Sequence, residues 1–173
     1  PPRDITGTAN ITPWIVLKLN AAPTTIPAGT GTANVQIAMN DGSSNNAIDL
    51  TTVNLTTTLG SIGTPGFAST VRTTSAGAAS ATFYAGTVAG TSVITATSID
   101  RGITTTLITI TGAAPSLVNL AAVPNVLDAD GVSTSTITAT VTDAYLNLID
   151  GKTITFTTNG LLGFEVSAAE IDG

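Results

Sequence analysis

The sequence predicts an all-β protein built of β-sandwiches, and three observations support this prediction. In Val126–Asp143, apolar residues and threonines alternate from Thr136 to Thr142, which is the period of a half-buried strand. Ile26–Asp41 alternates in the same way, with Val35, Ile37 and Met39 in its apolar positions. Turn residues separate further alternating stretches at intervals of about ten residues, and no stretch has a helical period.

The first hundred or so residues contain a series of expected strands. The first, at 14–19, places Leu17 and Leu19 toward a core and Lys18 toward water. Pro23 and Pro27 bracket a bend, because proline cannot donate a hydrogen bond to a sheet. The remaining strands are expected around Val35 and at 53–56, 79–83, 91–98 and 103–111, with a wide turn at 59–67, a connection at 86–90 and a turn at 101–102.

The pattern then restarts with a spacing that suits a whole domain rather than a short repeat. Gly112–Ser116 reads as a linker, Val118–Leu120 repeats Leu17–Leu19, Pro124 repeats Pro23, and Asp143 repeats Asp41. Ile154–Phe156 repeats the strand Val53–Leu55, and the counterparts of the last three strands of the first unit are missing. The expected organisation is an N-terminal extension (1–12), a first sandwich (13–112), a linker (113–116) and a partial second sandwich (117–173).

Composition limits the class of protein. Charged residues make up 9% of the 173 residues, against roughly 25% in an average domain, whereas an apolar content of 42% is ample for a core. The net charge of −6 argues against nucleic-acid binding, and no apolar run reaches the ~20 residues of a membrane-spanning helix. Few lysines, many threonines and an acidic balance favour a prokaryotic cell surface. Because residue 1 is Pro1, either the N-terminus is processed or the sequence is a fragment.

Several motifs resemble those of the bacterial immunoglobulin-like domain of the invasin and intimin group. They are the turn Ala129–Gly131 with its counterpart Ala28–Gly29, the aspartates that end the alternating strands, Ile154–Phe156, and Gly90–Ala96. The resemblance covers residues 14–173 and implies tandem immunoglobulin-like sandwiches displayed on a cell surface, in adhesins, surface layers or some phage structural proteins. It supplies no catalytic residues. The loop at 42–49 and the truncated second unit depart from the family pattern.

No metal or cofactor site is expected. Asp128 and Asp130 resemble the start of a calcium loop, but the glutamate that such a loop needs at its twelfth position would fall on Ala139. We therefore interpret the stretch as a turn. Histidine and cysteine are both absent, so thiolate metal sites, disulfides and a histidine base are excluded.

Catalysis is also not expected, and the chain is predicted not to be an enzyme. Its few carboxylates sit mostly in turns, and an aromatic content of 4% leaves little surface for stacking sugars. A self-formed Lys–Asn crosslink needs a lysine that faces the core. Lys18 is expected to face water, because it alternates with Leu17 and Leu19, and Lys152 lies at a turn. Asn10 and Asn54 each begin an Asn-x-Thr triplet and are candidate glycosylation acceptors.

Two functions remain open: a building block of an extracellular filament, sheath or surface layer, and a stalk or binding domain of a cell adhesin. The expected partners are other copies of the chain or neighbouring immunoglobulin-like domains, and a cell-surface receptor. The second unit either continues in a longer tandem protein or is completed by a strand donated from a neighbour. The N-terminal extension suits such a donor, because its alternating residues are candidates for a subunit contact: Ile5, Gly7, Ala9 and Ile11.

Overall fold

The computed structural model describes residues 16–40, 50–99 and 101–157, and within these ranges it contains strands and no helix. The all-β prediction is confirmed. The strands are β1 (Val16–Ala22), β2 (Thr25–Pro27), β3 (Thr32–Asn40), β4 (Thr52–Thr57), β5 (Ser61–Ile62), β6 (Ser69–Thr73), β7 (Ala78–Tyr84), β8 (Gly90–Ser98), β9 (Gly102–Thr111), β10 (Leu117–Val123) and β11 (Thr136–Thr142).

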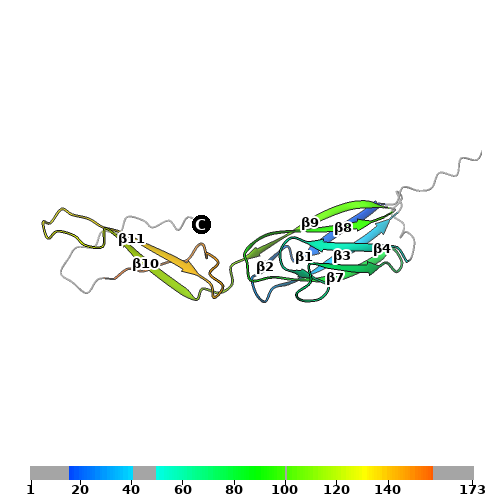
Figure 1. Ribbon diagram of the computed structural model, residues 1–173, viewed down its shortest axis with the longest axis horizontal. Coiled ribbons are helices and arrows are strands. Elements are labelled where there is room, and N and C mark those ends of the chain that lie inside the picture. Colours follow the sequence, from blue (N-terminus) through cyan, green and yellow to red (C-terminus); the bar gives the residue numbers. More distant parts are fainter. Residues whose placement is uncertain (1–15, 41–49, 100, 158–173) are drawn as a thin grey trace, which may run out of the picture.

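The first nine strands form two sheets that pack face to face (Figure 1). One sheet has the order β1-β3-β7-β5 and the other β2-β9-β8-β4-β6. All pairs are antiparallel except β2 with β9, which run parallel. We refer to these two sheets as the sandwich.

Alternate residues of both sheets fill the space between them. Val35, Ile37 and Met39 of β3 are at most 1% exposed, as their alternation predicts. The opposite sheet contributes fully buried side chains from three strands, among them Leu55, Ile94, Ala96, Ile108 and Ile110. Phe83 of β7 is a large, fully buried side chain of this core. Burial of this kind, rather than charge, holds the two sheets together.

Strands β10 and β11 form a separate two-stranded sheet beyond one end of the sandwich (Figure 1). Their register repeats that of β1 and β3: Leu17 lies opposite Met39, and Val118 lies opposite Val141. The prolines that follow β1 and β10, Pro23 and Pro124, both have cis peptide bonds. We call β10, β11 and the residues up to 157 the second segment.

Some short elements differ from the sequence prediction. The bend after Pro23 contains β2, the predicted turn at 59–67 contains β5, and β6 was not predicted. Conversely, the strand predicted at Ile154–Phe156 is absent from the described residues. Its counterpart β4 lies between β6 and β8, and no equivalents of those two strands are present among the described residues of the second segment.

Candidate functional site

The residues predicted to be functional do not converge on one site. Asn54 lies on β4 between Thr97 of β8 and Val71 of β6, and its side chain is exposed on the outer face of the sheet. Asn10 and the predicted contact residues Ile5, Gly7, Ala9 and Ile11 fall outside the described residues.

Asp130 stabilises its own turn. Its Oδ1 accepts hydrogen bonds from the backbone amides of Val132 (2.9 Å) and Ser133 (2.8 Å), and its Oδ2 accepts one from the Ser133 hydroxyl (2.8 Å). These bonds lower the pKa of the Asp130 carboxyl from 3.8 to about 2, the Ser133 amide contributing most. Across the described residues, no three carboxylates gather where they could hold a metal ion.

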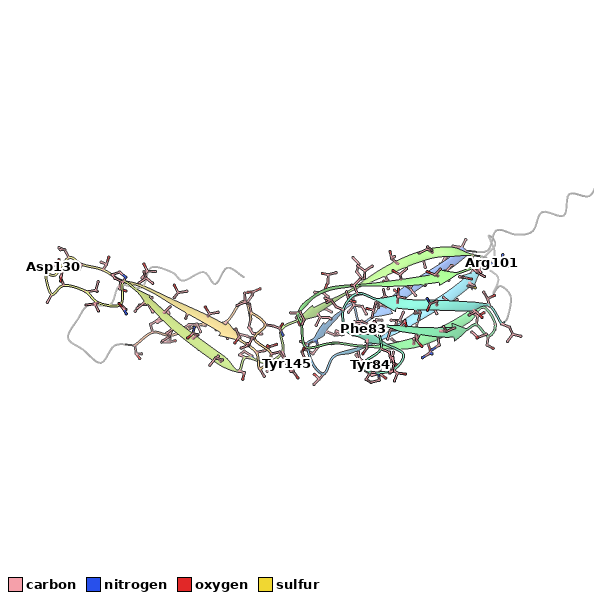
Figure 2. The ribbon with its side chains drawn as sticks, viewed as in Figure 1. Phe83, Tyr84, Arg101, Asp130 and Tyr145 are labelled. Atoms are coloured by element: carbon pink, nitrogen blue, oxygen red, sulfur yellow. The ribbon has the colours of Figure 1, made fainter. Side chains whose placement is uncertain are left out.

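The loop that follows β11 forms the contact between the second segment and the sandwich. We call residues 143–152 the joint loop. It lies against the end of the sandwich from which the linker leaves, near the labelled Tyr145 in Figure 2. It is anchored to its own strand, because the Ile149 amide donates to the Val141 carbonyl (3.0 Å).

Asp143 organises the joint loop from a position where it is only 1% exposed. Its Oδ1 accepts hydrogen bonds from the amides of Tyr145 (2.8 Å) and Asn147 (2.9 Å). Its Oδ2 accepts one from the Ala113 amide in the linker (2.9 Å) and one from Asn147 Nδ2 (2.8 Å). The carboxylate thus ties the linker to the loop and satisfies backbone donors that would otherwise be unpaired.

The environment of Asp143 keeps it ionised. Burial of the carboxyl raises its pKa, but the hydrogen bonds from the Asn147 side chain and from the amides of Ala113, Asn147 and Tyr145 together lower it by more. The result is a pKa of about 2, against an ordinary 3.8. Hydrogen bonds to the charged form have outweighed desolvation.

Asn147 reaches across to the sandwich. Its Nδ2 donates to the Thr87 carbonyl (2.8 Å), and its Oδ1 accepts from the Ala89 amide (2.8 Å). Both partners lie in the connection between β7 and β8. Because donor and acceptor of one amide bind the same connection, the position and the orientation of the loop are both fixed.

Apolar packing completes the joint on two sides. The Tyr145 ring lies over Gly29, where an added Cβ would come within 2.5 Å of the tyrosine hydroxyl. Gly29 has φ of 80°, so this turn favours glycine both for its backbone and for the contact. On the linker side, Ile149 is 7% exposed and occupies the space that a side chain at Gly112 would need.

A pocket and several hydrogen-bonded polar groups lie where the second segment meets the sandwich. A pocket of about 460 Å³ lies between the segments, lined by residues that include Ile110, Gly112, Leu148 and Lys152. The side chains of Asp143 and Asn147 form hydrogen bonds that fix the second segment relative to the sandwich.

In the described part of the chain, no helix has the length and apolarity to cross a membrane.

Sequence reasoning did not find the joint. It equated Asp143 with Asp41 as the end of a strand and gave neither residue a role. One local signal was available: an aspartate directly after a strand followed four residues later by an asparagine, residue types whose side chains bind nearby backbone amides. The partners Thr87 and Ala89 are distant in sequence, and no local signal indicates them.

Comparison with known proteins supports the fold. Neither the protein-family models nor the curated proteins searched give a match. Among solved structures, InvD of Yersinia pseudotuberculosis is 32% identical with a TM-score of 0.60, over 78% of this chain and 39% of that one. The adhesin InvE of the same organism is 27% identical with a TM-score of 0.49, over 61% of this chain and 29% of that one.

A third structure is the C-terminal 282-residue fragment of intimin in complex with the intimin-binding domain of its translocated receptor. It is 17% identical with a TM-score of 0.46, over 73% of this chain and 46% of that one. The chain therefore spans less than half the length of each of these structures. The likeness to InvD confirms the predicted resemblance of this chain to the bacterial immunoglobulin-like domains of the invasin and intimin group.

Proposed function

We propose that this chain is a non-enzymatic part of a cell-surface adhesin of the invasin and intimin type, in which it forms stalk modules held in a fixed relative orientation. In this proposal residues 13–112 and 117–173 belong to successive immunoglobulin-like units, with 113–116 as the linker. The likeness to InvD supports the adhesin class. A receptor on a host or neighbouring cell is the partner that such a role implies.

The joint is the observation that supports a stalk. Domains in one chain move relative to one another unless their interface restrains them. Here the linker amide of Ala113 binds Asp143, and the connection at 87–89 binds Asn147. Restraints on both the linker and the adjoining connection oppose bending and twisting, which is what a module needs in order to hold a binding tip away from the cell.

Distance measurement between spin labels tests the fixed orientation. The chain has no cysteine, so labels attach only to introduced cysteines, such as Thr82→Cys in β7 and Thr138→Cys in β11, both exposed. We expect one narrow distance distribution, and a broader one when Asn147→Ala is added. A matched Asn119→Ala control, on the exposed β10, should leave the width unchanged. A broad distribution in the unmodified labelled chain would contradict the proposal.

A second candidate function is a building block of a surface filament. It is favoured by the apolar side chains of the second segment that remain exposed: Val118 (50%), Leu120 (59%) and Ile137 (40%). Exposed apolar faces of this kind recruit other chains. If the chain forms a filament by strand donation, residues 1–12 of a neighbouring copy cover that face. Deleting residues 1–12 should then abolish fibre formation, as measured by electron microscopy. Fibres that persist after the deletion would exclude strand donation.

A further inference from the structure

Two Asp–Gly pairs lie in the described part of the chain, both of them in the second segment. Asp130–Gly131 lies in the turn before β11, and Asp150–Gly151 lies in the joint loop. All four residues are exposed, and both glycines have a positive φ, 74° at Gly131 and 67° at Gly151. Apart from chain neighbours, no described heavy atom lies within 4 Å of a Cβ added to either glycine. The two pairs are therefore matched in sequence, exposure and glycine conformation.

The two pairs differ in what holds the aspartate carboxylate. The Asp130 carboxylate accepts three hydrogen bonds, from the amides of Val132 and Ser133 and from the Ser133 hydroxyl. Among the described residues, neither the Asp150 carboxylate nor the Gly151 amide takes part in a hydrogen bond or an ion pair. The Asp150 side chain can therefore turn toward the amide that follows it, whereas the Asp130 side chain is held on amides further along its turn.

An aspartate that precedes a glycine can react with its own backbone, because glycine has no Cβ to hinder the approach. At Asp150, the Gly151 nitrogen would form a bond to the aspartate Cγ while the carboxyl C–O bond breaks, and the hydroxyl would leave as water with the amide proton. The product is a five-membered succinimide. Water then adds to one of its two carbonyls. Opening at the Cγ side restores aspartate, and opening at the other side leaves isoaspartate, in which the chain runs through Cβ and Cγ.

We propose that Asp150 is a site of spontaneous isomerisation to isoaspartate, and that its hydrogen bonds protect Asp130 from the same reaction. The hydroxyl leaves most readily from the protonated carboxyl. The bonds to Asp130 hold its pKa at about 2 rather than 3.8, so above pH 4 its protonated form is roughly 60-fold scarcer than that of an ordinary carboxyl. The reaction needs no enzyme and no reactant besides water, and it does not depend on the adhesin role.

Isomerisation at Asp150 alters the backbone where the joint loop is anchored. The preceding residue, Ile149, is 7% exposed, and its amide donates to the Val141 carbonyl. Its side chain also occupies the space that a side chain at Gly112 would need. Isoaspartate adds one methylene to the backbone directly after Ile149, which changes the geometry that holds this residue against the linker. The joint should therefore loosen as the molecule ages.

Peptide mapping by mass spectrometry tests the modification at each site. After weeks at mildly acidic pH, the chain is digested with a protease that cleaves before aspartate but not before isoaspartate, so each modified site leaves one missed cleavage. In the folded chain, isoaspartate should accumulate at Asp150 at least about tenfold faster than at Asp130. In denaturant the two rates should become equal, because the bonds to Asp130 are lost. Equal rates in the folded chain, or no isoaspartate at Asp150, would overturn the proposal.

Variants of the chain test the mechanism and its effect on the joint. Gly151→Ala adds a Cβ that hinders the attack and should slow isomerisation at Asp150 by about tenfold, whereas the matched control Gly131→Ala should leave that rate unchanged. In isomerised molecules separated by chromatography, hydrogen exchange at the Ile149 amide should be faster, and exchange at the Met39 amide in the sandwich should not change. An unchanged rate in Gly151→Ala would contradict the succinimide route, and unchanged exchange at Ile149 would contradict the effect on the joint.

Discussion

The pair β1–β3 and the pair β10–β11 share one pattern and one register but differ in what covers them. In the sandwich Val35 is fully buried, whereas its counterpart Ile137 is 40% exposed. Leu17 is 8% exposed, and its counterpart Val118 is 50% exposed. The exception is Val141, at 3%, which lies next to the joint loop. Alternation therefore specifies the register, while burial requires a second layer.

The largest effect should come from placing a carboxylate at equivalent positions of the two pairs. Val35→Asp buries an unpaired charge, which costs several kcal/mol, comparable with the ~5–15 kcal/mol stability of a typical domain. We expect the sandwich to be unfolded by circular dichroism at 25 °C. Ile137→Asp should change the free energy of unfolding by less than about 1 kcal/mol, because water already reaches this position. Similar losses in both variants would mean that Ile137 is also covered in solution.

A smaller effect is expected from breaking the contact that joins the two regions. Asn147→Ala removes the acceptor for the Ala89 amide and the donor to Thr87. A hydrogen bond contributes about 1 kcal/mol, so hydrogen exchange at Ala89 should accelerate by roughly fivefold. The amide of Met39, which donates to the Gly77 carbonyl at the end of the sandwich away from the joint, serves as the control and should not change. Unaltered exchange at Ala89 would show that other contacts close the joint.

The most graded effect is the response to acid. The pKa of Asp143 is lowered in the folded chain to about 2 from 3.8, so its contribution to stability is complete above pH 4 and is lost as pH falls toward 2. The Ala113 amide resonance should follow this titration by NMR, and Asp143→Asn should abolish it. Asp130 titrates in the same window but should move only the amides of Val132 and Ser133. An Ala113 resonance with a midpoint near 4 would contradict the bonded geometry of Asp143.

The sequence was sufficient for strands whose signal is local. The alternation through Val35, Ile37 and Met39 predicted both the strand and its buried face, and the repeat predicted β10 and β11. It was insufficient where structure depends on distant partners. Strand β5 has two residues and exists through its pairing with β7, and Ile154–Phe156 has the pattern of a strand but does not form one in the described residues. The joint was missed for the same reason, because Asn147 binds a connection about 60 residues earlier in the chain.

The short linker also determines how the joint behaves after it breaks. Residues 113–116 span at most about 14 Å when extended, at up to ~3.6 Å per residue. If Asn147 releases Thr87 and Ala89, the second segment therefore remains tethered within reach of the same connection. Tethers this short give effective concentrations in the millimolar range or above. A joint broken by a pulling force should re-form when the force is removed, without any encounter between separate molecules.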